Sequence, residues 1–189
     1  ILKEAWSESY FKVKAEVEEY LAELDKVATL LSSKGIPLVA LKNSGIARAL
    51  YLDCGQSPMG DIDVLVDKEQ FRRAHSILVE NGYKMKFRSA LEKEDLVLAE
   101  AGGGAEYSVD LNSGKHLWFE LQWRPVSGRW INEEREPKAN DLISRSIPID
   151  GSNVRLLSPE DNLLQVALHT AKHTYVRAPG FRLHTDVDR

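Results

Sequence analysis

Two aspartates, Asp61 and Asp63, open the apolar run GDIDVLV. Residues two apart in a β-strand project from the same face, so both carboxylates point one way while Ile62, Val64 and Val66 point into a core. Neighbouring carboxylates repel each other unless a cation lies between them. Mg²⁺ suits such a pair, because it binds one or two carboxylates and completes its shell with water and phosphate oxygens. A lone Asp-x-Asp is also typical of a turn followed by a solvated residue.

A third carboxylate is needed, since two-metal sites for phosphoryl or nucleotidyl transfer generally use three. Glu120 is the first candidate, because it lies in the largely apolar run HLWFELQW, where an unpaired carboxylate would be unfavourable. Alternatively, Glu120 pairs with an arginine such as Arg124 on a solvated sheet face. Asp110 is the second candidate, because its predicted strand is adjacent in sequence.

A polar turn, Lys42-Asn43-Ser44-Gly45, separates a predicted strand from a short helix. Backbone N–H groups at such a turn and helix N-terminus can hold phosphate. Ser44 could donate to a phosphate oxygen and Lys42 could neutralise it. Asn-Ser-Gly also simply forms a turn and a helix cap. The motifs GxxxxGK[ST] and GxGxxG are both absent, so the sequence does not predict a P-loop or a dinucleotide-binding loop.

The elements that must position these residues follow from periodicity and turn signals. Within residues 89–105, residues 91–100 could form either a helical turn or a strand, and residues 102–104 form a flexible connection. The other predicted elements are helices at 9–33, 46–51, 68–80 and 158–175, and strands at 36–41, 61–66, 83–88, 108–111, 115–123, 143–149 and 154–157. We therefore expect an N-terminal helix (1–34) packed on an α/β core (35–125), followed by a smaller, mainly helical part (126–189).

Composition narrows the class of protein. The 189 residues are 43% hydrophobic and 29% charged, which is typical of a globular protein. The net charge of −4, without a basic block, does not favour binding to long nucleic acid. A single cysteine, Cys54, excludes a disulfide within the chain and indicates a cytoplasmic location. No apolar run reaches the ~18 residues of a membrane span, and either end could be a truncation, since the first residue is not Met.

Several segments resemble a known family. IPLVALKNSGIARALY and GDIDVLV resemble the uncharacterised bacterial nucleotidyltransferase-like family, which has an LKG turn and a DIDLLV strand, within the DNA polymerase β-type nucleotidyltransferase superfamily. FELQW resembles the later acidic strand of that family, and LLSPEDNLLQVALHTAKH and FRLHTDVDR resemble its C-terminal helical motifs.

The resemblance implies an α+β fold with a mixed sheet flanked by helices. It also implies that Asp61, Asp63 and Glu120 bind two Mg²⁺ ions, and that the Lys42–Gly45 turn holds the triphosphate of an NTP. The sequence departs from the family pattern in three ways: Asn43 stands where glycine is usual, the glycine-then-serine order of the wider superfamily is inverted as Ser44-Gly45, and Gln122 stands where histidine is frequent. Asparagine tolerates left-handed backbone geometry, so the turn is still expected to form.

Two C-terminal groups of residues are further candidates for substrate contact. His169 and His173 are four apart on a predicted helix, but HTAKH lacks the glutamate of HExxH, so a zinc hydrolase is not supported. They could instead lie at a lobe interface or contact substrate. Asp186, in HTDVDR, could position a nucleotide or an acceptor, or could belong to an ordinary helix start.

The leading hypothesis is a Mg²⁺-dependent nucleotidyltransferase that transfers NMP from an NTP to an acceptor hydroxyl, releasing pyrophosphate. The alternative is a module of the same fold that binds a nucleotide with little or no turnover. A third possibility is another metal-dependent phosphotransferase or hydrolase using the same acids. The acceptor stays open among small molecules, peptides, protein side chains and RNA ends.

Overall fold

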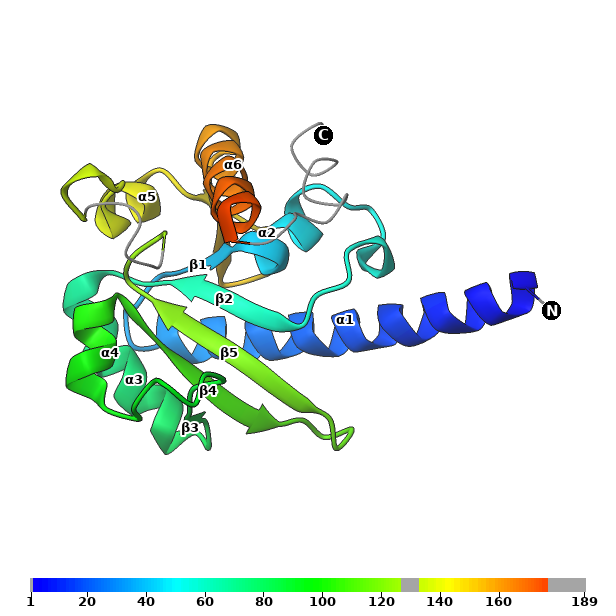
Figure 1. Cartoon of the computed structure of the whole chain (residues 1–189), viewed down its shortest axis with the longest axis horizontal. Helices are drawn as coiled ribbons and strands as arrows, with labels where there is room; N and C mark the ends of the chain where they lie inside the picture. Colours follow the sequence, from blue (N-terminus) through cyan, green and yellow to red (C-terminus); the bar gives the residue numbers. More distant parts are fainter. Residues whose placement is uncertain (1, 127–132, 177–189) are drawn as a thin grey trace.

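The computed structural model describes residues 2–126 and 133–176 and is built around one mixed sheet (Figure 1). The strand order is β3-β4-β5-β2-β1-β7-β6. The strands are β1 (Leu38–Leu41), β2 (Asp61–Leu65), β3 (Lys84–Met85), β4 (Gly104–Asp110), β5 (His116–Gln122), β6 (Ile147–Pro148) and β7 (Val154–Leu156). The predicted strands at 36–41, 61–66 and 115–123 are confirmed as the centre of the sheet.

The helices flank this sheet. They are α1 (Leu2–Ser32), α2 (Lys42–Ala49), α3 (Phe71–Glu80), α4 (Leu96–Gly102), α5 (Ala139–Ser144) and α6 (Pro159–Val176), with short 3₁₀ helices η1 (Cys54–Gln56), η2 (Lys68–Gln70) and η3 (Glu133–Arg135). Within residues 2–126 and 133–176, none of the helices combines the length and the apolar character that a membrane crossing requires. The predicted helices at 9–33, 68–80 and 158–175 are all present, the second as η2 followed by α3.

One face of the sheet carries most of the core. Ile62 and Val64 of β2 are fully buried, in one hydrophobic cluster with Leu24 of α1 and Phe71 of α3. Phe119 of β5 belongs to the same cluster. The alternation predicted for β2 and β5 therefore places their apolar residues under α1 and α3, which leaves the opposite face free for polar side chains.

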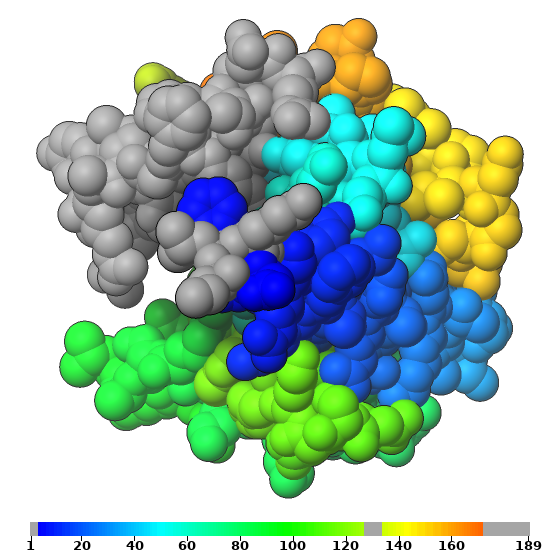
Figure 2. Space-filling model, turned by 90° about the vertical axis from the view of Figure 1, so that its right-hand side faces the viewer, coloured from blue at the N-terminus to red at the C-terminus, as the bar shows by residue number. Residues whose placement is uncertain are grey.

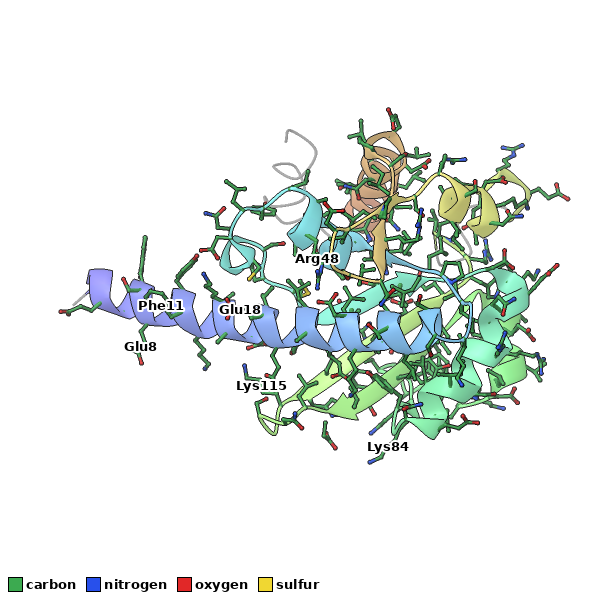
Figure 3. The ribbon with its side chains drawn as sticks, turned by 180° about the vertical axis from the view of Figure 1, so that it is seen from behind. Glu8, Phe11, Glu18, Arg48, Lys84 and Lys115 are labelled. Carbon is green, nitrogen blue, oxygen red and sulfur yellow. The ribbon has the colours of Figure 1, made fainter. Side chains whose placement is uncertain are left out.

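The long helix α1 is held on the sheet by ion pairs at several points. Arg48 of α2, which lies beside α1 in Figure 3, pairs with Asp25 and donates to the Leu21 carbonyl at 3.1 Å. Lys14 of α1 pairs with Asp53, beside η1, at 3.2 Å. Lys115, in the β4–β5 turn, pairs with Glu16 of α1 at 3.1 Å. In the space-filling view, α1 accordingly lies between the cyan segment that contains η1 and the green β4–β5 turn (Figure 2).

The C-terminal part adds to the same sheet. β7 pairs in parallel with β1, with Leu38 opposite Val154. On the sheet face opposite α1, Leu142 of α5 packs in a cluster with Val39 and Leu65. α6 begins as predicted, with Pro159 as its first residue and the Ser158 hydroxyl accepting a hydrogen bond from a backbone N–H of the first turn. The predicted boundary at residue 125, between the α/β core and the C-terminal part, stays a prediction.

Three segments differ in the structure from what the sequence predicted. The strand at 143–149 begins only at Ile147, because Ala139, Leu142 and Ile143 have helical spacing and pack as one face of α5. The strand at 83–88 is limited to Lys84–Met85, at the edge of the sheet. The open region 89–105 contains α4, and β4 already begins at Gly104 within the expected flexible connection.

Candidate active site

The carboxylates predicted from the sequence lie on one face of the sheet. Asp61 and Asp63 belong to β2, and Glu120 belongs to β5, which pairs with β2 in parallel. The register places Asp63 directly opposite Glu120, and Asp61 opposite Trp118. Because residues opposite each other on neighbouring strands point to the same side, Asp63 and Glu120 lie next to each other. Their convergence depends on the two central strands and on no loop.

Lys42, the first residue of α2, lies between these two acids. Its Nζ is 2.5 Å from Asp63 Oδ1 and 3.3 Å from Glu120 Oε2. Gln122, on the same face of β5, donates to Asp63 Oδ1 at 3.1 Å. The Asp63 side chain is 3% exposed, so the carboxylate depends on these donors in place of water. The arginine pairing considered for Glu120 is not formed, since Arg124 pairs with Glu136.

Burial and neighbouring charge set the protonation of this pair. Burial raises the pKa of Asp63 well above its ordinary value, the Lys42 charge opposes that shift, and the adjacent Glu120 adds to it. Burial also acts to raise the pKa of Glu120, but Lys42 and a hydrogen bond with Asp63 outweigh it and lower that pKa to about 2. Burial likewise acts to lower the pKa of Lys42, yet the two acids hold it above its ordinary value. The site thus favours one carboxylate beside one ammonium ion, and a second negative charge needs a further cation.

Asp61 has a different partner. Arg88, just after β3, donates from Nη1 to Asp61 Oδ2 at 2.7 Å and from Nε to Glu106 Oε2 at 3.2 Å. Its guanidinium carbon is 5.6 Å from the centre of the Trp118 ring. Glu106 lies on β4 opposite Glu120, so it extends the acidic face by one strand. Two positively charged side chains, Lys42 and Arg88, therefore accompany the acids.

The Lys42–Gly45 segment is the first turn of α2, and its unusual residue is Lys42. Lys42 has φ +49°, the single positive φ among non-glycine residues in the described parts of the chain. Its backbone N–H donates to Gln165 Oε1 of α6 at 3.0 Å. The turn was expected to form despite Asn43 because asparagine tolerates left-handed geometry, but the left-handed residue is Lys42. The turn into the helix is made one residue earlier, so Asn43 is already helical.

Ser44 and Gly45 fix this helix against the sheet. Ser44 is fully buried, and its Oγ lies 2.7 Å from the Leu41 carbonyl oxygen and 2.9 Å from that of Asp63, while accepting the Asp63 N–H at 3.2 Å. A Cβ on Gly45 would lie 2.8 Å from the Ala40 carbonyl oxygen. The hydroxyl of Ser44 thus supports the strand that carries Asp63, and this geometry gives no support to its predicted contact with phosphate.

A model of the uncharacterised nucleotidyltransferase family matches residues 1–189. The protein belongs to this family. Among curated proteins, no sequence matches it.

Three solved structures of nucleotidyltransferases or nucleotidyltransferase-like proteins share the fold of this protein. ANT(2")-Ia in complex with adenylyl-2"-tobramycin has a TM-score of 0.55 and 13% identity, covering 89% of this chain and 85% of that one. An antigenic nucleotidyltransferase-like protein from Paracoccidioides brasiliensis has a TM-score of 0.54 and 16% identity, covering 90% and 73%. A candidate nucleotidyltransferase from Thermotoga maritima has a TM-score of 0.50 and 16% identity, covering 84% and 89%. At these identities the likeness shows the fold, and it confirms the mixed α/β class expected from the sequence.

The other sequence candidates fall outside this candidate site or outside the described residues. Asp110 lies at the end of β4, exposed and 3.0 Å from His116, and is not brought to the aspartate pair. His169 lies on α6, half-buried. His173 is also on α6, but its side chain lies outside the described part, as does Asp186.

Within the described residues, no group of three or more His, Cys, Asp or Glu side chains is arranged to hold a metal ion. The three acids of the candidate site are instead paired with Lys42 and Arg88. Sequence reasoning missed Arg88 and Gln165, since nothing in the pattern connects either of them with the acids. Gln122 was noted only as a departure from the family pattern, and it donates to Asp63.

Replacing Gly45 with alanine is expected to lower the free energy of unfolding by about 1–3 kcal/mol, because the added methyl group meets the backbone of β1. Urea denaturation measures this. Gly102→Ala is the matched control, since a Cβ there meets nothing within 4 Å, and it should cause no loss. Equal stability of the two variants would contradict the tight contact between α2 and β1.

Replacing Ser44 with alanine is expected to lower the free energy of unfolding by about 1–3 kcal/mol, because the buried Asp63 N–H loses its acceptor. Ser144→Ala, which removes an exposed hydroxyl bonded to the Asp141 carbonyl, should change stability far less. If Ser44→Ala kept full stability but bound NTP more weakly, the hydroxyl would serve phosphate binding after all.

Proposed function

We propose that the protein is a metal-dependent nucleotidyltransferase that transfers a nucleoside monophosphate from an NTP to an acceptor hydroxyl, with pyrophosphate as the leaving group. The observation that carries the proposal is the register of β2 and β5, which sets Asp63 and Glu120 side by side with Asp61 on the same face. Family membership agrees with this reaction class. The single cysteine, Cys54, favours a cytoplasmic location.

The residues at the site fit Mg²⁺ in the chemistry of their donors. Asp61, Asp63 and Glu120 supply carboxylate oxygens, which this ion prefers. Because burial raises the pKa of Asp63, a further cation beside it would favour its charged form. These three residues would hold two Mg²⁺ ions. When bound, the ions would stabilise the negative charge that develops on the transferred phosphoryl group.

The chain's own residues would complete the reaction. The first turn of a helix has N–H groups without partners inside the helix, and a phosphate can use them. Apart from the Lys42 N–H, which is bonded to Gln165, the Lys42–Gly45 turn would therefore hold the triphosphate beside the acids, with the Lys42 side chain neutralising part of its charge. Glu120 would complete the set of carboxylates beside Asp63 and could help to deprotonate the acceptor hydroxyl.

The acceptor would approach over the polar sheet face that continues from Glu120 to Glu106. The net charge of −4 disfavours long nucleic acid as that acceptor. The structure of ANT(2")-Ia contains an adenylylated small molecule, adenylyl-2"-tobramycin. By analogy of fold, a hydroxyl-bearing small molecule is the first class of acceptor to test here.

The test combines binding with product analysis. We expect NTP and Mg²⁺ together to raise the melting temperature, and a panel of hydroxyl-bearing acceptors to include one that supports pyrophosphate release. Release of inorganic phosphate would instead indicate a hydrolase or phosphotransferase. If no NTP of the panel binds, the proposal is wrong.

A second candidate function is a nucleotide-binding module without turnover. The pairing of Lys42 with Asp63 and Glu120, and of Arg88 with Asp61, favours it, because both cations already neutralise the acids. This candidate predicts NTP binding without pyrophosphate release for any acceptor, and binding that survives removal of Mg²⁺.

A further inference from the structure

The ammonium group of Lys42 occupies the position that a cation shared by Asp63 and Glu120 would need. With Nζ at 2.5 Å from one carboxylate and 3.3 Å from the other, no second cation fits between them. The lysine side chain is only 17% exposed, so this is a buried contact and not a loose surface pair. A metal ion bridging the two acids must displace the ammonium group.

The backbone of Lys42 adopts an unfavourable left-handed conformation, with φ +49°. A left-handed conformation costs a non-glycine residue roughly 1–2 kcal/mol. The hydrogen bond from the Lys42 N–H to Gln165, which is itself buried, stabilises it. Strain at a residue whose side chain meets buried acids indicates a functional constraint on that side chain.

We propose that Lys42 is an exchangeable counter-ion: it neutralises Asp63 and Glu120 until a divalent cation binds there, and then turns to the triphosphate of the nucleotide. This inference rests on the proposed function. Lysine suits the exchange, since its ammonium group sits on a flexible four-carbon stem and binds as a point charge. Arg88 stands in the same relation to Asp61, but its side chain is 41% exposed, so solvent screens the pair and the effect there is smaller.

The exchange explains two features together. The two acids need a cation whether or not a metal ion is bound, because their side chains are only 3% and 17% exposed and little water reaches them. The triphosphate also needs a cation near the first turn of α2, where Lys42 begins the helix. One side chain meets both requirements in turn, and the charge of the site stays balanced as metal and nucleotide enter.

The first test measures Mn²⁺ binding by electron paramagnetic resonance in the full chain and in the variant Lys42→Met. The variant should bind Mn²⁺ about tenfold more tightly, because the competing ammonium group is gone. The control Lys14→Met removes a lysine whose ion pair with Asp53 is partly exposed, and it should bind Mn²⁺ like the unchanged protein. In the metal-free state Lys42→Met should melt at a lower temperature, and Mn²⁺ should restore it.

The second test needs no variant and applies if Lys42→Met does not fold. Acetylation followed by mass spectrometry reports lysine accessibility. Lys42 should be protected in the unchanged protein, become labelled with Mn²⁺, and be protected again when a non-hydrolysable NTP is added, while Lys14 labels equally throughout.

Equal Mn²⁺ affinity of the unchanged protein and Lys42→Met, or Lys42 labelling that Mn²⁺ does not change, would overturn the exchange. Neither result would overturn the proposed function, which the pyrophosphate assay tests separately. If no acceptor gave pyrophosphate but Lys42→Met bound Mn²⁺ more tightly, the exchange would be supported and the catalytic proposal would be wrong.

Discussion

Asp63→Asn is expected to reduce pyrophosphate release about a thousandfold. Metal ions stabilise developing charge by several kcal/mol, and each ~1.4 kcal/mol corresponds to a factor of ten in rate. Asp63 is the most buried of the three acids and is placed opposite Glu120, so it is the residue best positioned to share an ion with it. The amide keeps the size of the side chain but loses its negative charge.

The fold should tolerate this change. Burial raises the pKa of Asp63, which means that the structure accommodates an uncharged side chain at this position. Circular dichroism and the melting temperature check this. Asp110→Asn is the matched control, because Asp110 lies exposed at the end of β4 beside His116, and it should keep full activity. Retained activity in Asp63→Asn would remove the basis of the proposed chemistry.

Glu120→Gln is expected to have the second-largest effect, a loss of pyrophosphate release of at least about a hundredfold. Glu120 is the only acid that β5 offers to this face, next to Asp63, and a glutamine there cannot take the acceptor proton. Steady-state kinetics over a range of Mg²⁺ concentrations should show a lower kcat and a higher Mg²⁺ requirement.

Glu106→Gln is the matched control for this variant. Glu106 lies directly opposite Glu120 in the sheet register, on β4, and pairs with Arg88. Replacing Glu106 should reduce pyrophosphate release much less than replacing Glu120 does. If Glu106→Gln were the more damaging change, the third acid would come from β4 and the assignment of Glu120 would be wrong.

The central part of the fold was predictable because its signals are local. The run LVAL is apolar throughout and becomes β1, buried on both faces. In GDIDVLV the alternation of aspartates with Ile62 and Val64 determines which face each side chain takes. The run around Glu120 predicted this residue as the candidate third acid, and the register places it opposite Asp63.

The cations of the site could not be predicted in the same way. Lys42 and Asp63 are far apart in the chain, and Gln165 lies on the last described helix, so their contacts follow from the order of the strands in the sheet. Periodicity does not encode that order. Arg88 was read as the end of a strand, although β3 ends at Met85 and the chain beyond it carries Arg88 to Asp61.

The pairing of β2 with β5 has a wider consequence. Neighbouring strands lie about 4.8 Å apart whatever joins them, so the spacing of Asp63 and Glu120 is set by backbone hydrogen bonds alone. The intervening chain, with α3, α4, β3 and β4, can gain or lose residues without altering that spacing. Related proteins with very different insertions between these strands could thus share identical acid geometry while presenting new surfaces to new compounds.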